Sequence, residues 1–218
     1  FAFLMLAFVT TYGQDGFFVP ANEDWVPIDQ PTGIRADPDV YLQGNFVEIG
    51  ITAAGSCGTV YSFAPGGYHN YYSGLGFVAD YQKDGWAVGT PPYSGDYFLP
   101  GSPYEGWLVE FTYLGTEYTF QNAEAVGYNM VPQTSLVNTS AGTTHSAVWT
   151  GTATAEGQSL RVVQNFHFED NDAKFMIDVT LTNVGPEPLY DVEYARAVDP
   201  DQEVDLGGDF VTTNYVGH

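Results

Sequence analysis

Positive charge is scarce in this chain, and its scarcity excludes whole classes of protein. Five Lys and Arg residues stand against 27 Asp and Glu residues in 218 positions, so the formal net charge at pH 7 is -22. With so few cations the chain has no basic patch to neutralise phosphates, and we expect neither a nucleic-acid partner nor attraction to an anionic membrane surface. Such acidity is typical of a solvated anionic exterior that keeps a secreted protein soluble.

Cysteine is represented by Cys57 alone. A single thiol excludes an internal disulfide and a metal cluster built on thiolates. The residues around Cys57 are apolar and include no cation that would lower the pKa of the thiol. The sequence therefore predicts a small buried side chain rather than a nucleophile.

A long helical period of apolar residues is also missing. Short segments rich in β-branched and aromatic residues, separated by Gly, Pro and acidic turns, take its place. Hydrophobic residues make up 44% of the chain and aromatics 16%, which is enough for a core without disulfides. The predicted fold class is all-β, an antiparallel β-sandwich of ordinary size or in the larger super-sandwich form.

The clearest strand signals lie in the second half of the chain. A Thr-rich and Ala-rich segment at 145–155 is followed by three segments of alternating apolar and polar residues, at 159–168, 175–182 and 189–198. Their short separations predict that these three strands follow one another in a single antiparallel sheet with one buried face. Further strands are predicted at 47–51, 58–63, 75–81, 107–114 and 116–120.

The start of the chain predicts a secreted protein, and its end predicts a domain that continues beyond residue 218. Residues 1–13 form an apolar run followed by small residues, typical of the end of a signal peptide cleaved before Gln14, with a buried N-terminal strand as the alternative. Residues 14–38 contain four prolines and several acids, as an N-terminal arm or linker does. We expect the β-sandwich domain at 39–218, continuing beyond it, in an extracellular or cell-surface protein whose mature chain does not insert into a membrane.

Residues 62–111 are dense in aromatics, Gly, Pro and carboxylates, which fits loops that present rings to a ligand. Flat rings give a large contact area at low entropy cost. The leading interpretation is a non-enzymatic protein of adhesion, surface structure or glycan contact, with glycans or other surface proteins as partners. The predicted ligand-binding residues are Trp86, Tyr93, Tyr97, Tyr104 and Trp107.

The same stretch supports an enzymatic alternative, a carbohydrate-active enzyme of super-sandwich type. Glycoside hydrolysis needs two carboxyl groups roughly 5 to 10 Å apart. A chain this acidic offers neighbouring carboxylates by chance, so the sequence favours no particular pair as catalytic. The candidate carboxylates are Asp80, Asp84, Asp96 and Glu105. A third hypothesis is that the chain is the first module of a longer adhesin.

Carboxylates recur at every second position near the end of the chain. In an extended segment they point the same way, and such crowding is relieved by water or by a hard cation such as Ca²⁺. The spacing is not that of an EF-hand, because Val204 stands where Gly is required and Phe210 where Glu is required. A solvated acidic loop is the alternative to a calcium site. The predicted calcium ligands are Asp199, Asp201, Glu203 and Asp205.

The segment 175–202, FMIDVTLTNVGPEPLYDVEYARAVDPDQ, resembles secreted bacterial surface proteins, in which an L-T-N-x-G turn links two strands of a β-sandwich module. It is also similar to the super-sandwich domains of galactose-mutarotase-like and β-galactosidase-like proteins, in which a long strand, an N-x-G turn and a returning strand recur. The resemblance covers Gln158 to Gln202, about a fifth of the chain. It implies an extracellular sandwich, and it transfers no catalytic residue, because the sequence gives no secure alignment of His145, His167 or Glu193 with the mutarotase His and Glu.

Overall fold

The computed structural model describes residues 39–59, 63–69, 74–86, 96–98, 105–123 and 130–198. Within these ranges the chain forms ten strands and no helix, which confirms the all-β class, and no helix there is long and apolar enough to cross a membrane. In chain order the strands are β1 (Val40–Gln43), β2 (Val47–Ile51), β3 (Phe77–Ala79), β4 (Gly106–Tyr113), β5 (Thr116–Ala123), β6 (Gln133–Asn138), β7 (Thr144–Ala155), β8 (Gln158–Glu169), β9 (Met176–Asn183) and β10 (Tyr190–Ala197).

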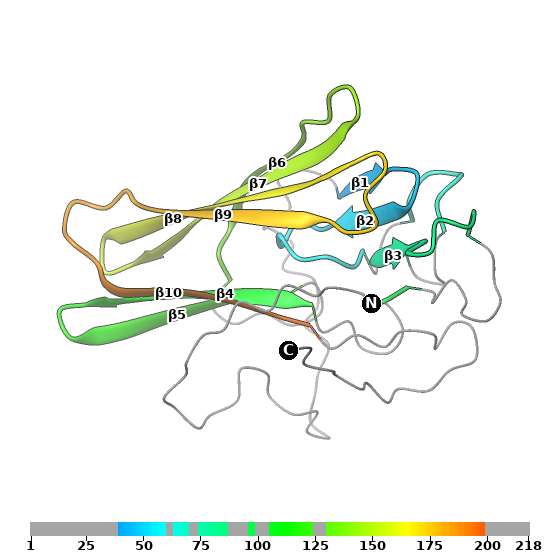
Figure 1. Ribbon diagram of the computed structural model, residues 1–218. Helices are drawn as coiled ribbons and strands as arrows, with labels where there is room; N and C mark the ends of the chain where they lie inside the picture. Colours follow the sequence, from blue (N-terminus) through cyan, green and yellow to red (C-terminus); the bar gives the residue numbers. More distant parts are fainter. Residues whose placement is uncertain are drawn as a thin grey trace, which may run out of the picture.

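The strands form three antiparallel sheets with a sandwich at their centre. One sheet has the order β6-β7-β8-β9, the second β10-β4-β5 and the third β1-β2-β3. Figure 1 shows the four-stranded sheet lying over the β10-β4-β5 sheet, with the small β1-β2-β3 sheet at one end of the pair. This arrangement is the antiparallel sandwich that the alternating segments predict.

Strand β10 lies in a different layer from the one expected. Phe166 of β8 pairs with Ile177 of β9, as predicted, but β10 crosses to the other sheet, where Tyr194 pairs with Val109 of β4. The expectation of three consecutive neighbours in one sheet is therefore wrong for β10. Alternation shows which face of a strand is buried, but the inner faces of both layers bury their apolar residues in the same core. The pattern therefore does not show to which layer a strand belongs.

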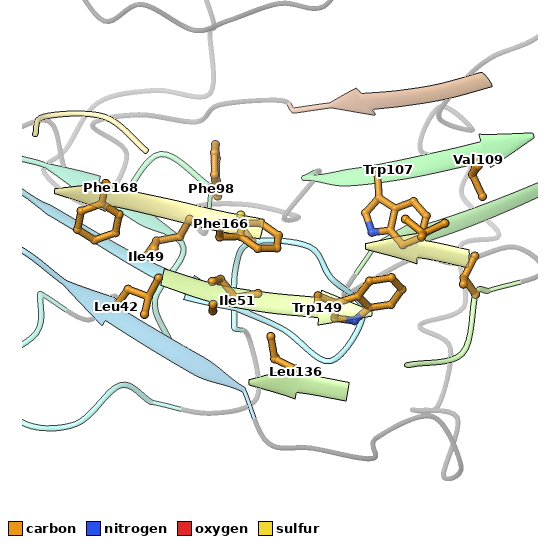
Figure 2. Packing of buried hydrophobic residues seen from close by; sticks show 14 of the residues in the cluster. Leu42, Ile49, Ile51, Phe98, Trp107, Val109, Leu136, Trp149, Phe166 and Phe168 are labelled. Carbon is orange, nitrogen blue, oxygen red and sulfur yellow. The ribbon is translucent and has the colours of Figure 1, made fainter. Parts of the chain in front are cut away.

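The core lies between the two larger sheets and extends to the β1-β2-β3 sheet, and two fully buried tryptophans belong to it. The rings of Trp107 and Trp149 meet edge to face, with centroids 5.2 Å apart and planes at 71° (Figure 2). Each indole N–H donates to a carbonyl of the loop after β2, Trp107 to Ala54 O at 3.0 Å and Trp149 to Ala53 O at 2.9 Å. The two rings therefore join both layers of the sandwich to that loop.

Acidic side chains face one another on the outer surface of the β10-β4-β5 sheet. Glu193 of β10 pairs with Glu110 of β4, and the Thr119 hydroxyl donates to Glu110 Oε2 at 2.8 Å. Burial raises the pKa of Glu110, the bond from Thr119 opposes that rise, and the charges of Glu117 and Glu193 add to it. Because this pKa is higher in the folded protein than in the unfolded chain, Glu110 opposes folding once the pH has risen past its ordinary pKa.

We expect Glu193→Gln to stabilise the protein at pH 7 by about 0.5 kcal/mol, because like charges directly opposite on paired strands destabilise them. Urea unfolding at pH 7 measures the gain, which should vanish at a pH below the ordinary pKa of a glutamate, where these carboxyls are protonated. Glu187→Gln, in the exposed turn after β9, is the matched control. An equal gain from both substitutions would assign the effect to net charge rather than to the facing pair.

Candidate functional site

Strand β2 places a carboxylate in the interior. All five residues of β2 are buried, and Glu48 among them is only 1% exposed. A buried carboxylate is tolerated only when it is hydrogen-bonded or paired. The backbone N–H of His69 donates to Glu48 Oε2 at 2.7 Å, while His69 Nδ1 and Gln43 Nε2 lie 3.0 Å and 2.9 Å from Oε1. Glu48 therefore fixes the position of His69 against the β1-β2 pair.

The imidazole of His69 is 38% exposed, so this pair reaches the surface. The hydrogen bond with Glu48 raises the pKa of His69, burial opposes the rise, and the charges of Glu48 and Asp80 add to it. Burial, together with the charge of Glu48, also raises the pKa of the neighbouring Tyr68. The carboxylate of Glu48 therefore acts on both rings.

A second buried carboxylate, Asp80, follows β3 and shapes the loop that carries Trp86. Its Oδ2 accepts the N–H groups of Gly85 at 2.8 Å and Trp86 at 2.9 Å, and its Oδ1 accepts that of Asp84 at 3.2 Å. Burial acts to raise the pKa of Asp80, but these backbone hydrogen bonds outweigh it and hold the pKa below its usual value. One ionised side chain thus organises the whole turn.

Two residues of the loop from Asp80 to Trp86 have backbone angles in the left-handed region. Lys83 has φ 59° and Trp86 has φ 63°, and each such residue costs roughly 1–3 kcal/mol. Lys83 Nζ donates to Asn171 O at 2.5 Å and lies 4.9 Å from the centroid of the Phe46 ring, so the loop is tied to the β8–β9 turn. Strained backbone of this kind persists where the surroundings fix it and clusters at ligand-binding segments.

Three rings pack against a small apolar cluster of Ala64, Leu75 and Val78, and a fourth, that of His69, stacks on one of them. The His69 and Trp86 rings are stacked, with centroids 4.3 Å apart and planes at 24°, and Tyr41 meets Tyr68 edge to face at 6.1 Å. Tyr41, Tyr68 and Trp86 are partly buried against the cluster. We name Tyr41, Tyr68, His69 and Trp86 the aromatic platform.

Two of the other rings predicted to bind a ligand lie in the core. Trp107 is 0% exposed and stacks on Tyr194 at 5.8 Å, and Tyr97 is buried against Phe77, with ring centroids 5.2 Å apart. The structure thus places Trp107 and Tyr97 in the core rather than on a ligand-facing surface, because β4 turns Trp107 inward and Tyr97 packs against β3. Tyr93 and Tyr104 lie outside the described residues.

Three of the four candidate catalytic carboxylates are buried acceptors for the protein's own backbone. Asp80 holds its loop, as described above. Asp96 accepts the N–H groups of Gly76 at 2.7 Å, Phe98 at 2.9 Å and Phe77 at 3.2 Å. Glu105 accepts a hydrogen bond from the backbone N–H of Cys57 at 2.5 Å and also binds Arg196. Asp84 alone of the four is exposed, on the loop that carries Trp86.

Cys57 is buried, as predicted. Burial raises the pKa of its thiol, the charge of Glu105 raises it further, and Arg196 opposes both. The sequence around Cys57 contains no cation, yet Arg196 Nη2 lies 3.7 Å from the sulfur, brought there by β10. A thiol with a raised pKa stays protonated at neutral pH, which fits a structural side chain.

The predicted calcium ligands Asp199, Asp201, Glu203 and Asp205 lie outside the described residues, so the calcium site stays a prediction. Among the residues that the structure does describe, no group of three or more His, Cys, Asp or Glu side chains is arranged to hold a metal ion. The aromatic platform is therefore the candidate site in this part of the chain.

Sequence reasoning found Trp86 but missed Glu48 and His69. In the sequence Glu48 alternates with apolar residues, a pattern that predicts an exposed side chain. His69 has no other histidine at a spacing typical of metal ligands. The available signal was a lone carboxylate within an apolar strand, at 47–51, followed by an aromatic-rich loop with a histidine.

Asp80→Asn tests the role of Asp80 in the loop. We expect a loss of about 1.5–3 kcal/mol in the free energy of unfolding at pH 7, because hydrogen bonds to a charged acceptor are weakened. The pKa of Asp80 is depressed in the folded protein, so its contribution is present above the ordinary pKa of an aspartate and is lost as the pH falls through the folded value. The difference from the unsubstituted protein should therefore shrink in acid.

Chemical denaturation at pH 7 and at low pH measures this difference. Asp178→Asn is the matched control, since Asp178 is 70% exposed and pairs with His167 at 2.9 Å on the sheet surface. Its substitution should change stability by less than about 1 kcal/mol. Equal losses from both variants at pH 7 would contradict the assigned role of Asp80.

Comparisons with known proteins do not identify the chain. No protein-family model matches it, no curated protein matches it, and no solved structure matches it. The inference of function therefore starts from the aromatic platform.

Proposed function

We propose that the protein is a secreted or cell-surface β-sandwich that contacts glycans through the aromatic platform and does not catalyse a reaction. The observation that carries this proposal is the stack of His69 on Trp86, at 4.3 Å, on a strained loop that Asp80 holds in place. A sugar ring offers a face of C–H groups to an aromatic ring and a rim of hydroxyls to polar groups. The platform combines flat rings with an imidazole and carboxylates, which suits both parts of such a ligand.

The extracellular location in this proposal rests on residues 1–13, which are typical of a signal peptide. The formal charge of -22 supports a role at a hydrated surface, where it limits self-association. The enzymatic alternative has less support, because Asp80, Asp96 and Glu105 already accept hydrogen bonds from the protein. A carboxylate engaged in this way is poorly placed to exchange a proton with a substrate.

The test is binding of the full chain to a panel of soluble oligosaccharides, measured by calorimetry for the unsubstituted protein and for Trp86→Ala. We expect Trp86→Ala to weaken binding at least tenfold, about 1.4 kcal/mol, because the stacking surface is lost. Tyr190→Ala is the matched control, since Tyr190 is an aromatic residue of β10 that is 62% exposed and lies outside the platform. Unchanged binding by Trp86→Ala, or no binding by the unsubstituted protein to any member of the panel, would overturn the proposal.

A further inference from the structure

Strand β9 is an open edge of the four-stranded sheet. The sheet has the order β6-β7-β8-β9, so β9 pairs with β8 on one side and with no described strand on the other (Figure 1). Its pairing with β8 runs from Met176 to Asn183 without a register shift. A long and regular edge of this kind presents a row of backbone N–H and C=O groups that can pair with another strand.

Two other edges of the sandwich have features that oppose the addition of a strand. The pairing of β10 with β4 shifts register between Tyr190 and Glu193, Asp191 lies there at φ 46°, and both acids are exposed. The pairing of β6 with β7 is also irregular. Bulges and edge charges are means by which natural sheets avoid edge-to-edge association. Of these three edges β9 is the regular one, so it is the best suited to receive a strand.

The core of the sandwich is incompletely covered along β9. Ile177, Val179 and Leu181 pack against the core but are only partly buried, whereas the three residues of β8 opposite them are 0% exposed. The alternate residues Asp178 and Thr180 are exposed on the outer face. A strand added beside β9 would therefore cover apolar side chains as well as pair with backbone groups, and burial of apolar surface favours association.

The sequence of β9, MIDVTLTN, is complementary to itself in the antiparallel direction. If Val179 lies opposite Val179 of a second copy, Ile177 meets Leu181 on the inner face. On the outer face Asp178 then meets Thr180, so no carboxylate faces its own copy. Like charges directly opposite on paired strands destabilise them, whereas apolar pairs stabilise them. A shift by two residues would set Asp178 against Asp178 in one direction and reduce the number of apolar pairs in the other.

We infer that two copies of the chain pair through β9 in the antiparallel direction, centred on Val179, so that their four-stranded sheets form one continuous sheet. The inference goes beyond the proposed function, because it concerns a different surface of the molecule. Asp178 of each copy keeps its partner His167 on its own β8, where its Oδ2 lies 2.9 Å from Nε2 of the imidazole. The acid of β9 is therefore already paired when the second strand arrives.

The dimer leaves both aromatic platforms free. The start of β9 lies at the end of the sandwich that carries the β1-β2-β3 sheet, where Asn45 Nδ2 donates to Asn171 Oδ1 at 3.1 Å (Figure 1). Because antiparallel pairing reverses the direction of the second copy, the two platforms lie at opposite ends of the joined sheet. Two sites on one molecule strengthen its hold on a surface of repeated ligands, which suits the proposed contact with glycans.

The net charge of the chain sets the conditions of the test. Each copy carries a formal charge of -22, which opposes association until salt screens the repulsion. The contacts at β9 are apolar side chains and backbone hydrogen bonds, so salt does not weaken them in return. Sedimentation equilibrium of the full chain, with no glycan present, measures the dissociation constant. We expect a dimer that tightens at least tenfold between about 0.05 M and about 0.5 M salt.

Two lysine variants locate the interface on β9. Val179→Lys should weaken the dimer at least tenfold in high salt, because an inward-pointing charge on an edge strand blocks pairing. Val137→Lys is the matched control, since Val137 is 51% exposed on β6, the opposite edge of the same sheet. Its substitution should leave the dimer unchanged. Circular dichroism checks that each variant keeps its strands.

Two cysteine variants test the register. In the inferred pairing residue 179 lies opposite its own copy, with Cβ atoms about 4.5–5.5 Å apart. Val179→Cys should therefore form a disulfide-linked dimer when a mild oxidant is added. Leu181→Cys, which lies opposite Ile177, should not. The natural thiol of Cys57 is buried and does not compete.

Three results would overturn the inference. A chain that stays monomeric in high salt would leave the edge of β9 to a strand of a different protein, and the proposed glycan contact would still stand because the assay contains no glycan. Equal weakening by both lysine substitutions, or equal cross-linking by both cysteine variants, would place the interface elsewhere. If Val179→Lys does not fold, the cysteine variants decide, since a link at 179 alone supports the pairing and its absence overturns it.

Discussion

Glu105→Gln is expected to lower the free energy of unfolding by about 3–5 kcal/mol, because it leaves a largely buried cation, 17% exposed, without its partner. Arg196 of β10 lies between the layers of the sandwich, where its Nε and Nη2 groups both donate to the carboxylate of Glu105. Burial acts to lower the pKa of Arg196, but the charge of Glu105 outweighs it and raises the pKa, so the guanidinium stays charged. Neutral glutamine keeps the volume of Glu105 and removes the compensating charge.

The guanidinium of Arg196 has further hydrogen-bond partners that hold it in place. Its Nη1 donates to Gln164 Oε1 at 2.5 Å and to the Tyr194 hydroxyl at 3.1 Å, and its Nη2 donates to Gly55 O at 3.2 Å. These partners come from β8, β10 and the loop after β2. The guanidinium thus ties β10, which changes layer, to β8, to the loop after β2 and, through Glu105, to the start of β4.

Urea unfolding of Glu105→Gln measures the loss, and the exposed pair substitution Asp178→Asn is the reference. Glu105→Leu combined with Arg196→Met should recover much of the stability, because replacing both members of a buried ion pair with apolar residues is often neutral or stabilising. A loss from Glu105→Gln no larger than that from Asp178→Asn would contradict the pairing of Glu105 with Arg196.

The predictions that succeeded concern long strands with one buried face. Along β8, Leu160, Val162 and Phe166 are buried while Arg161 is exposed, as the alternation of 159–168 predicts. The turn before β8 was also predictable from the sequence, because Gly157, at φ 75°, supplies the left-handed conformation that a tight hairpin needs. Period-two patterning works where a strand has one side in the core and the other in water.

The strand β6 was missed because it carries little of that pattern. Its sequence, QTSLVN, contributes Leu136 to the core, while Val137 is exposed. The pairing with β7 is also irregular between Gln133 and Ser135, so the alternation is interrupted. Such a strand is specified by its neighbour β7 more than by its own residues, and a single sequence does not display that neighbour.

The candidate site was predicted in composition and not in geometry. Rings and carboxylates between residues 62 and 111 were expected to meet a ligand, and Trp86 does lie on the aromatic platform. The sequence could not show that Asp96 and Glu105 face inward to hold backbone, since hydrogen bonds to residues 20 or more positions away leave no local pattern. Nor could it show that β2 is covered on both faces. A side chain at Gly50 would collide with Leu75 O, and Glu48 is buried.

Trp149→Ala is expected to lower the free energy of unfolding by about 3–5 kcal/mol, because a large cavity opens between the sheets and the indole N–H of Trp149 no longer reaches Ala53 O. Trp149→Phe separates the two causes. Phenylalanine keeps most of the ring and deletes the donor, so a loss of about 1–3 kcal/mol is expected from the unsatisfied carbonyl. Urea denaturation of the two variants at pH 7 gives both values, and equal losses would contradict a cavity as the larger cause.

Two glycines make room for this indole, and one of them allows a stricter test. A Cβ added at Gly151 would collide with Cη2 of Trp149 and lie 2.8 Å from Pro132 O, and one added at Gly55 would lie 2.9 Å from Cδ2 of Trp149. Gly151→Ala alone should therefore cost about 1–3 kcal/mol through overpacking. In the Trp149→Ala background the same methyl enters vacated space, so its cost should shrink by more than 0.5 kcal/mol, the non-additivity expected of residues in contact. Additive losses would mean that the backbone at Pro132, rather than the ring of Trp149, requires glycine at 151.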